Sequence, residues 1–145
     1  MIYELTNDII NKLNTVPELV GKVGARVGGT DTDIAMVEAP IPFAWVLYST
    51  SSPETNEMSN GRNYLIIQND FVVILAIDYG SDITDSEFMQ NSLSLIDKAV
   101  RAVHASEEVI YSGKWQYTGA SLHTVYPNRL IYQLGFSVNG HIQIQ

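Results

Sequence analysis

Side chains that could do chemistry are few in this sequence of 145 residues, and they are scattered along it. The three histidines, His104, His123 and His141, each lack a second histidine or a cysteine three or four positions away, as zinc sites often use. The chain contains no cysteine, which excludes disulfides, zinc–thiolate centres and cysteine nucleophiles. We therefore interpret the histidines as ordinary side chains at the surface or at the edge of the core.

Acidic side chains gather at two places. Asp31 and Asp33 follow a pair of glycines, and Asp82, Asp85 and Glu87 lie at the start of a predicted helix. Neither group has the twelve-residue spacing of a calcium-binding loop. Carboxylates at a helix N-terminus are also favoured by the helix dipole alone. We interpret both groups as structural, so the sequence predicts no metal site.

Two further motifs come close to catalytic ones without matching them. Val23 follows Gly21-Lys22, where a phosphate-binding loop needs Ser or Thr after its lysine. A Gly-x-Ser-x-Gly turn, which would expose a nucleophilic serine, does not occur. The sequence therefore predicts no catalytic residue and no cofactor, and we do not expect an enzyme.

The composition is that of an acidic globular protein. Asp and Glu number 16 against 8 Lys and Arg, and the resulting formal net charge of -8 disfavours nucleic acid as a specific partner. With 46% apolar residues, the chain can bury a core without a metal or a disulfide. No signal peptide is visible, and the longest apolar run, residues 71–77, is too short to span a bilayer. We expect one soluble domain over residues 1–145.

Hydrophobic periodicity and turn residues predict a mixture of helices and strands. The predicted elements are a helix at 3–15 that ends before Pro17, a short strand at 25–27, a strand at 43–48, a long polar loop at 49–61, strands at 64–67 and 71–77, a helix at 84–105, extended segments at 109–112 and 114–117, and strands at 121–126 and 129–138. Gln68-Asn69-Asp70 is predicted to be a hairpin turn, with one long bent strand as the alternative. The resulting fold is α+β, with a mixed, mostly antiparallel sheet of about five to six strands packed with an N-terminal helix and one long central helix.

The start of the second helix carries the clearest local signal. Thr84 and Glu87 have the spacing of a capping box, and Ile83 and Phe88 have that of a hydrophobic staple. The predicted buried face of this helix contains Phe88, Met89, Leu93, Ile96, Val100 and Val103. In the last strand, Leu130, Tyr132, Leu134, Phe136 and Val138 are predicted to be buried, alternating with Arg129, Gln133 and Ser137 on a wetter face.

Two segments are candidates for contacts with other proteins. The polar loop 49–61 contains Pro53, Glu54, Glu57 and Met58 and could become ordered against a neighbour. Trp115 and Tyr117 are predicted to lie in an exposed connection before the final strands. Tyr and Trp are enriched at protein interfaces, although packing at the rim of the core would also explain them.

The layout of the second half of the chain resembles a known family. A strand ending in Val-Val-Ile-Leu-Ala-Ile-Asp-Tyr leads through an acidic loop to a helix closing with Ile-Asp-Lys-Ala-Val-Arg-Ala-Val, residues 96–103. An aromatic connection, 111–119, then precedes a strand with Tyr-Gln-Leu-Gly-Phe-Ser-Val, residues 132–138. This order resembles the tail terminator (tail completion) proteins of Mu-like, contractile-tailed bacteriophages. His104-Ala-Ser-Glu-Glu stands where a Gly-Trp-Pro-like turn is expected, so the sequence departs from the family there.

The resemblance implies a structural role in a virion, at the junction of tail and neck, after assembly in the cytoplasm of the bacterial host. Such proteins form a six-fold ring on the head-proximal end of the tail tube and stop polymerisation. Their partners are further copies of the same chain, the tail tube protein, the sheath protein where the tail contracts, and neck or connector proteins. DNA passes through the ring without specific binding, and an acidic lumen would suit that passage.

Two alternatives stay open at this point. One is another structural protein of a phage neck or baseplate, or of a related contractile injection device. The other is an enzyme that binds a small ligand or a metal through Asp31, Asp33 and a histidine.

Overall fold

The computed structural model describes residues 2–27, 30–59, 62–79, 84–108 and 113–143. Its elements in chain order are α1 (Ile2–Leu13), a 3-10 turn (Pro17–Leu19), β1 (Val23–Ala25), α2 (Thr30–Glu38), β2 (Phe43–Ser59), β3 (Arg62–Asp78), α3 (Asp85–Glu87), a π-helical segment (Phe88–Leu93), α4 (Ser94–Val103), β4 (Gln116–Tyr126) and β5 (Arg129–Gln143). Asp82, Ile83 and the predicted segment 109–112 lie outside the described residues. No helix of the described chain is long and apolar enough to cross a membrane.

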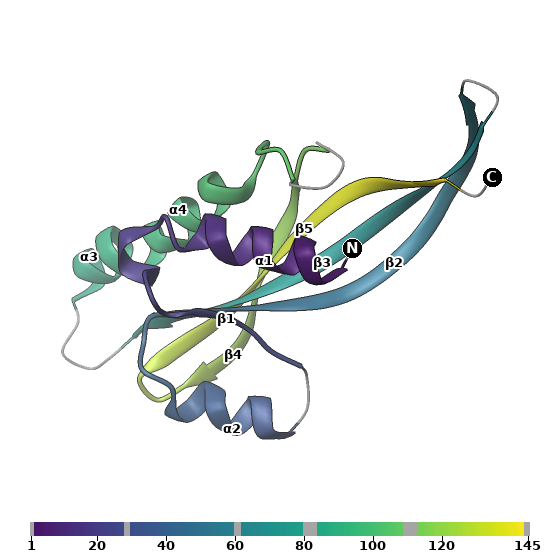
Figure 1. Cartoon of the computed structure of the whole chain (residues 1–145). Helices are drawn as coiled ribbons and strands as arrows, with labels where there is room; N and C mark the ends of the chain where they lie inside the picture. Colours follow the sequence, from purple (N-terminus) through teal and green to yellow (C-terminus); the bar gives the residue numbers. More distant parts are fainter. Residues whose placement is uncertain (1, 28–29, 60–61, 80–83, 109–112, 144–145) are drawn as a thin grey trace.

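The strands form one sheet in the order β1-β2-β3-β5-β4. β1 pairs with β2 in parallel, and all other neighbours are antiparallel. α1 and α4 lie on one face of this sheet, and α2 lies on the other (Figure 1). The predicted α+β fold with a mixed, mostly antiparallel sheet is therefore confirmed.

The core has two parts, one on each face of the sheet. On the face covered by α1 and α4, here called the helix face, alternate strand residues pack against both helices; they include Val46, Phe71, Leu75 and Phe136. On the α2 face, a smaller cluster joins Met36 to residues of β2, β3 and β5. Because side chains alternate along a strand, β3 is buried on both faces, as its continuous apolar run predicts.

The two predicted long helices are present with adjusted details. α1 ends at Leu13, four residues before Pro17, and a 3-10 turn follows. The capping box at Thr84 is confirmed: Glu87 N–H donates to Thr84 Oγ1 at 3.1 Å, and Thr84 N–H donates to Glu87 Oε2 at 3.3 Å. Its helix continues through the π-helical segment into α4.

The predicted buried face of that second helix is partly wrong. Phe88, Leu93 and Ile96 pack against the core as expected, but Met89 is 65% exposed. The fully buried positions of α4 are Leu95, Ala99 and Val103. A π-helical turn contains more residues than an α-helical turn, so the stripe changes phase between Phe88 and Leu95.

α2 was not predicted from the sequence. Ile34 and Val37 are exposed on it, and Met36 is its buried anchor, so the apolar residues do not follow one helical stripe. Its end is held from outside the helix: Arg129 Nη1 donates to the carbonyl oxygens of Met36 and Ala39. The predicted solvent-facing position of Arg129 is therefore wrong, because its guanidinium is buried against the last carbonyls of α2.

The predicted loop at 49–61 and the predicted turn at 68–70 are both wrong. β2 continues to Ser59, and β3 runs without interruption from Arg62 to Asp78, which is the long-strand alternative. Residues 50–59 of β2 pair with residues 62–70 of β3, as in Pro53 opposite Ile67 and Asn56 opposite Leu65. This pairing over a distance overrides the local preference for a loop.

The final hairpin is confirmed and longer than predicted. A turn at 127–128 joins β4 to β5. β4 includes the predicted strand 121–126, and β5 includes the predicted strand 129–138. Leu130, Leu134, Phe136 and Val138 are buried, as the alternation indicates. Tyr132 is only partly buried, but it packs against the same core.

Candidate assembly surface

A three-stranded arm extends beyond the helices (Figure 1). It consists of residues 50–59 of β2, 62–70 of β3 and 137–143 of β5. At the end of the arm nearest the core, Asp70 of β3 lies between Thr50 of β2 and Ser137 of β5. At a rise of about 3.3 Å per residue, residues 62–70 span about 30 Å. Only strands build the arm, so it can contact other molecules without disturbing the helix-covered core.

Both outer strands of the arm lack a neighbouring strand in the described chain. β1 pairs with β2 only from Ala44 to Val46, and β4 pairs with β5 only as far as Ser137. Pro53 fits this position, because proline has no N–H to donate and is tolerated on an edge strand. Two bulges, between Tyr48 and Thr50 and between Pro53 and Thr55, bend the same strand. The arm is thus a curved ribbon with two unpaired backbone edges.

A buried amide marks the root of the arm. Asn69 is fully buried, and Ser51 Oγ donates to its Oδ1 at 3.2 Å. Its Nδ2 has no hydrogen-bond partner among the described residues. Phe71, the next residue on the same face, belongs to the main core, so the apolar core ends at Asn69 and the arm begins there.

The structure brings four of the predicted contact residues together on one strand. Pro53, Glu54, Glu57 and Met58 all lie on the arm segment of β2. Glu54 is the extra residue of the second bulge. These residues therefore belong to a paired strand, although the sequence predicted a polar loop.

The prediction that Trp115 is exposed is wrong. Its side chain is fully buried and meets the ring of Phe71 edge-on, with 5.5 Å between ring centroids. Its indole N–H donates to Asp8 Oδ2 at 2.8 Å. A large aromatic ring with one donor can be buried where a carboxylate accepts that donor, and the sequence alone does not identify Asp8 as this partner. Trp115 therefore belongs to the core.

Tyr117 is half-buried and also differs from its prediction. Its ring tilts against Phe136 at a centroid distance of 5.8 Å and packs against the main core. Its backbone N–H donates to His104 Nδ1 at 3.0 Å, which ties β4 to the end of α4. The predicted exposed connection is thus the start of strand β4.

Strand β4 is a surface that sequence reasoning did not single out. Its outer edge has no partner strand in the described chain, and Leu122 and Val125 are 50% and 58% exposed. Both residues pair with helix-face residues of β5, namely Tyr132 and Leu130. Residues 116–126 contain no Asp, Glu, Lys or Arg, and this absence of charge was the available signal.

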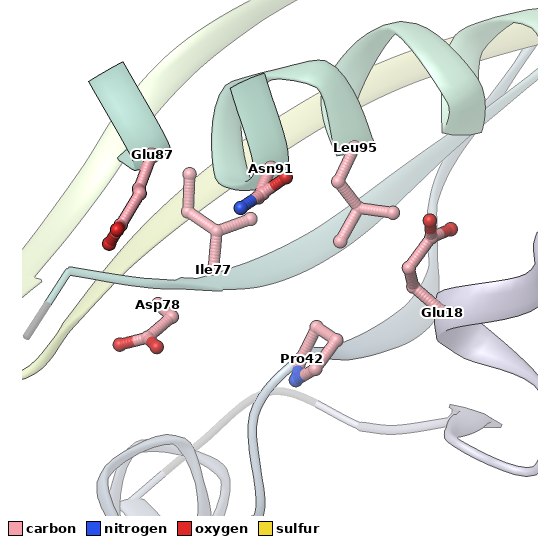
Figure 2. A pocket seen from close by; sticks show the side chains of 7 residues that line it. All are labelled: Glu18, Pro42, Ile77, Asp78, Glu87, Asn91 and Leu95. Carbon is pink, nitrogen blue, oxygen red and sulfur yellow. The ribbon is translucent and has the colours of Figure 1, made fainter. Parts of the chain in front are cut away.

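A hollow on the surface beside α3 does not bring reactive groups together (Figure 2). It encloses about 340 Å³ between the start of the second helix and β3, and its carboxylates are Glu18, Asp78 and Glu87. Figure 2 shows Glu18 and Glu87 at opposite ends, with Ile77 and Leu95 between them. The Glu87 carboxylate accepts the Thr84 N–H in the capping box, and Asp78 also takes part in an interaction of its own.

Glu18 has a partner of its own. Its Oε1 lies 2.6 Å from Lys98 Nζ, and this hydrogen bond lowers the pKa of the Glu18 carboxyl below its ordinary value of 4.5. A carboxylate that is held ionised by a lysine cannot act as a general acid near neutral pH. Glu18 and Glu87 therefore have structural roles, and the described lining of the hollow shows no group that is placed for catalysis.

No metal-binding arrangement is found among the described residues. His104 Nδ1 accepts from Tyr117, and His123 Nδ1 lies 3.0 Å from Gln133 Nε2. The backbones of Asp31 and Asp33 lie in the first turn of α2. In the described part of the chain, the arm and the edge of β4 present unpaired strand edges that can contact other chains.

No protein-family model and no curated protein matches this chain. Its fold is similar to that of a chain in a solved structure described as "Virion of native gene transfer agent (GTA) particle". The two chains share 12% identity with a TM-score of 0.51, and the match covers 96% of this chain and 97% of the other. At this identity the likeness establishes a shared fold.

Proposed function

We propose that this chain is a structural protein of a phage-like particle and that it caps the head-proximal end of a tail tube as a ring. The observation that carries the proposal is the end-to-end fold match with a chain of a virion particle, 96% of one chain against 97% of the other. Because neither chain contributes a large unmatched part, the likeness extends over nearly the full length of both chains, as expected if the two play comparable roles.

The arm supports an assembly role. Its two outer edges lack a partner strand among the described residues, and it extends about 30 Å from the helix-covered core. Such edges bind other chains by adding a strand, with backbone hydrogen bonds supplying the affinity. Pro53, Glu54, Glu57 and Met58 of β2 are our proposed contacts with the tube or with a neighbouring copy.

In this proposal the ring is a hexamer that ends tube polymerisation and joins the tail to neck or connector proteins, in the virion. It also meets the sheath protein if the tail contracts. The net charge of -8 suits a ring through which DNA passes, since an acidic lumen does not hold the phosphate backbone. No catalytic step is part of this function.

A second candidate is another structural position in the same kind of particle, such as the neck or the baseplate. The similar chain comes from a complete virion particle, and that observation fits either place. Gene order separates the two, because a terminator gene is expected beside the genes of the tube and sheath.

Electron microscopy of particles made without this protein tests the proposal. We expect tails of unregulated length that lack a head, and recovery of normal particles when the gene is supplied in trans. Headless tails of normal length with a finished end would instead indicate a role at the neck. Normal particles in its absence would rule out the proposed function.

A further inference from the structure

The outer edge of β4 lacks the charged and proline residues that commonly protect an edge strand. Natural proteins place lysine, proline or inward-pointing charges on such edges to prevent uncontrolled pairing. β4 contains none of these over residues 116–126. Bulges at Thr118 and His123 and the positive φ of Gly119 (137°) interrupt the strand, and residues 120–122 are the regular stretch between them. Leu122 and Val125 add exposed apolar surface on the helix face.

The opposite edge of the sheet has a matching character. Beyond Val46, β2 has no strand on its outer side in the described chain, and residues 47–52 contain neither a charged side chain nor a proline. Tyr48 is 42% exposed and contacts Phe71 on the helix face, with 5.6 Å between ring centroids. Exposed apolar side chains therefore lie on the same face at both edges of the sheet.

Strand directions decide how two such edges would meet. β4 is antiparallel to β5, β5 to β3, and β3 to β2, so β4 runs opposite to β2. If a second copy extends the sheet with its helix face on the same side, its β4 meets β2 in the antiparallel sense. Antiparallel pairs are slightly more stable per residue than parallel ones.

We propose that the β4 edge of one copy pairs with residues 47–52 of β2 in the next copy. β1 already pairs with Ala44–Val46 of β2. The β4 strand of the other copy must therefore pair with β2 at positions closer to the arm. This stagger places Val125 beside Tyr48, an aromatic and β-branched pair of the kind that stabilises antiparallel neighbours. Closing a sheet requires such a stagger.

This pairing is head-to-tail, because it joins two different surfaces of the same chain. Head-to-tail contacts close into rings when the rotation permits, whereas a twofold contact would use one surface twice. The inference therefore rests on the proposed ring and specifies the surfaces that build it.

Engineered cysteines test the contact directly, since the natural chain has none. Thr50→Cys is combined in turn with Ser121→Cys, Leu122→Cys and His123→Cys, and oxidised particles are separated on non-reducing gels. We expect a ladder of multimers from at least one double variant and only monomer from each single variant. Dimers from a single variant would indicate a twofold contact, and monomer from every double variant would overturn the proposal.

A charge on the edge provides a second measurement. Val125→Lys is expected to leave the thermal midpoint within about 2 °C of the wild-type value, because the side chain is exposed. It should reduce multimers at least tenfold, whereas the uncharged Val125→Thr should retain them. An undiminished amount of multimer from Val125→Lys would overturn the proposed pairing. The proposal that the protein caps a tail tube would not be affected by that result. Conversely, normal particles made without this protein would exclude the tail-cap function, whereas a ladder of cross-linked multimers would still support the pairing.

Discussion

The carboxylate of Asp8 joins three parts of the chain from inside the core. It is almost fully buried, accepts the indole N–H of Trp115 and pairs with Lys12 one turn later in α1. Lys12 Nζ also donates to the carbonyl oxygen of Glu107 at 2.8 Å. α1 is therefore fixed to both sides of the connection between α4 and β4.

Removing the indole donor should leave a buried carboxylate short of one partner. We expect Trp115→Phe to lower the free energy of unfolding by about 1–3 kcal/mol, measured by urea denaturation. Asp8→Asn combined with Trp115→Phe should cost less than the sum of the single changes. As a control, Lys98→Gln breaks an exposed pair with Glu18 and should cost less than about 1 kcal/mol. Additive single changes would mean that the two buried groups do not interact.

Lys98 also controls the titration of Glu18. Its ammonium donates to Glu18 Oε1 and lowers the pKa of that carboxyl from 4.5. Because the folded pKa is depressed, the pair stabilises the fold above the ordinary pKa and loses its effect as the pH falls through the folded pKa. Lys98→Met should raise the Glu18 pKa toward 4.5, as carbon NMR of the carboxyl group can measure. An unchanged pKa would show that the contact is not maintained in solution.

At the level of elements, sequence reasoning succeeded where the signals were local. The capping box at Thr84 and Glu87 lies within four residues, and the alternation of β5 needs no knowledge of its partners. It failed where a partner far along the chain decided the structure. The polar residues 49–59 form a strand because β3 pairs with them, and Trp115 is buried because Asp8 accepts its N–H.

The same reasoning applies to the candidate contact residues. Pro53, Glu54, Glu57 and Met58 were selected as members of a flexible loop, and they lie instead on an edge strand. The β4 edge was missed because edge position depends on the strand order, which a sequence pattern does not specify. Only the lack of charge in residues 116–126 was visible beforehand.

The cap at Thr84 can be tested as an isolated element. Thr84→Ala removes the oxygen that accepts the Glu87 N–H and should destabilise the protein by about 1 kcal/mol in chemical denaturation. Ser86→Ala is the matched control, since Ser86 is an exposed first-turn residue that does not take part in the capping box. Equal effects of the two substitutions would argue against the cap as a source of stability.

At the scale of the whole molecule, stability and assembly reside in different regions. The buried clusters join the helices to residues 43–46, 71–77 and 130–138, whereas the arm consists of strands beyond the helices. The arm should therefore be removable without loss of the core. This separation is what a protein needs if it must fold before it meets its neighbours.

A matched truncation of the arm makes that separation measurable. Ser52 pairs with Gln68, and Gln68 pairs with Asn139, so residues 53–67 can be replaced by Asn-Gly and the chain ended after Asn139. A two-residue turn of this type suits an antiparallel hairpin. We expect a cooperative thermal transition and a protein that no longer caps tails in electron micrographs. A control that substitutes only Glu54→Gln and Glu57→Gln keeps the backbone edges and tests whether charge or strand pairing provides the contact. Normal capping by the truncated protein would exclude the arm beyond Ser52 from assembly and leave the pairing of the β4 edge with residues 47–52 as the remaining candidate contact.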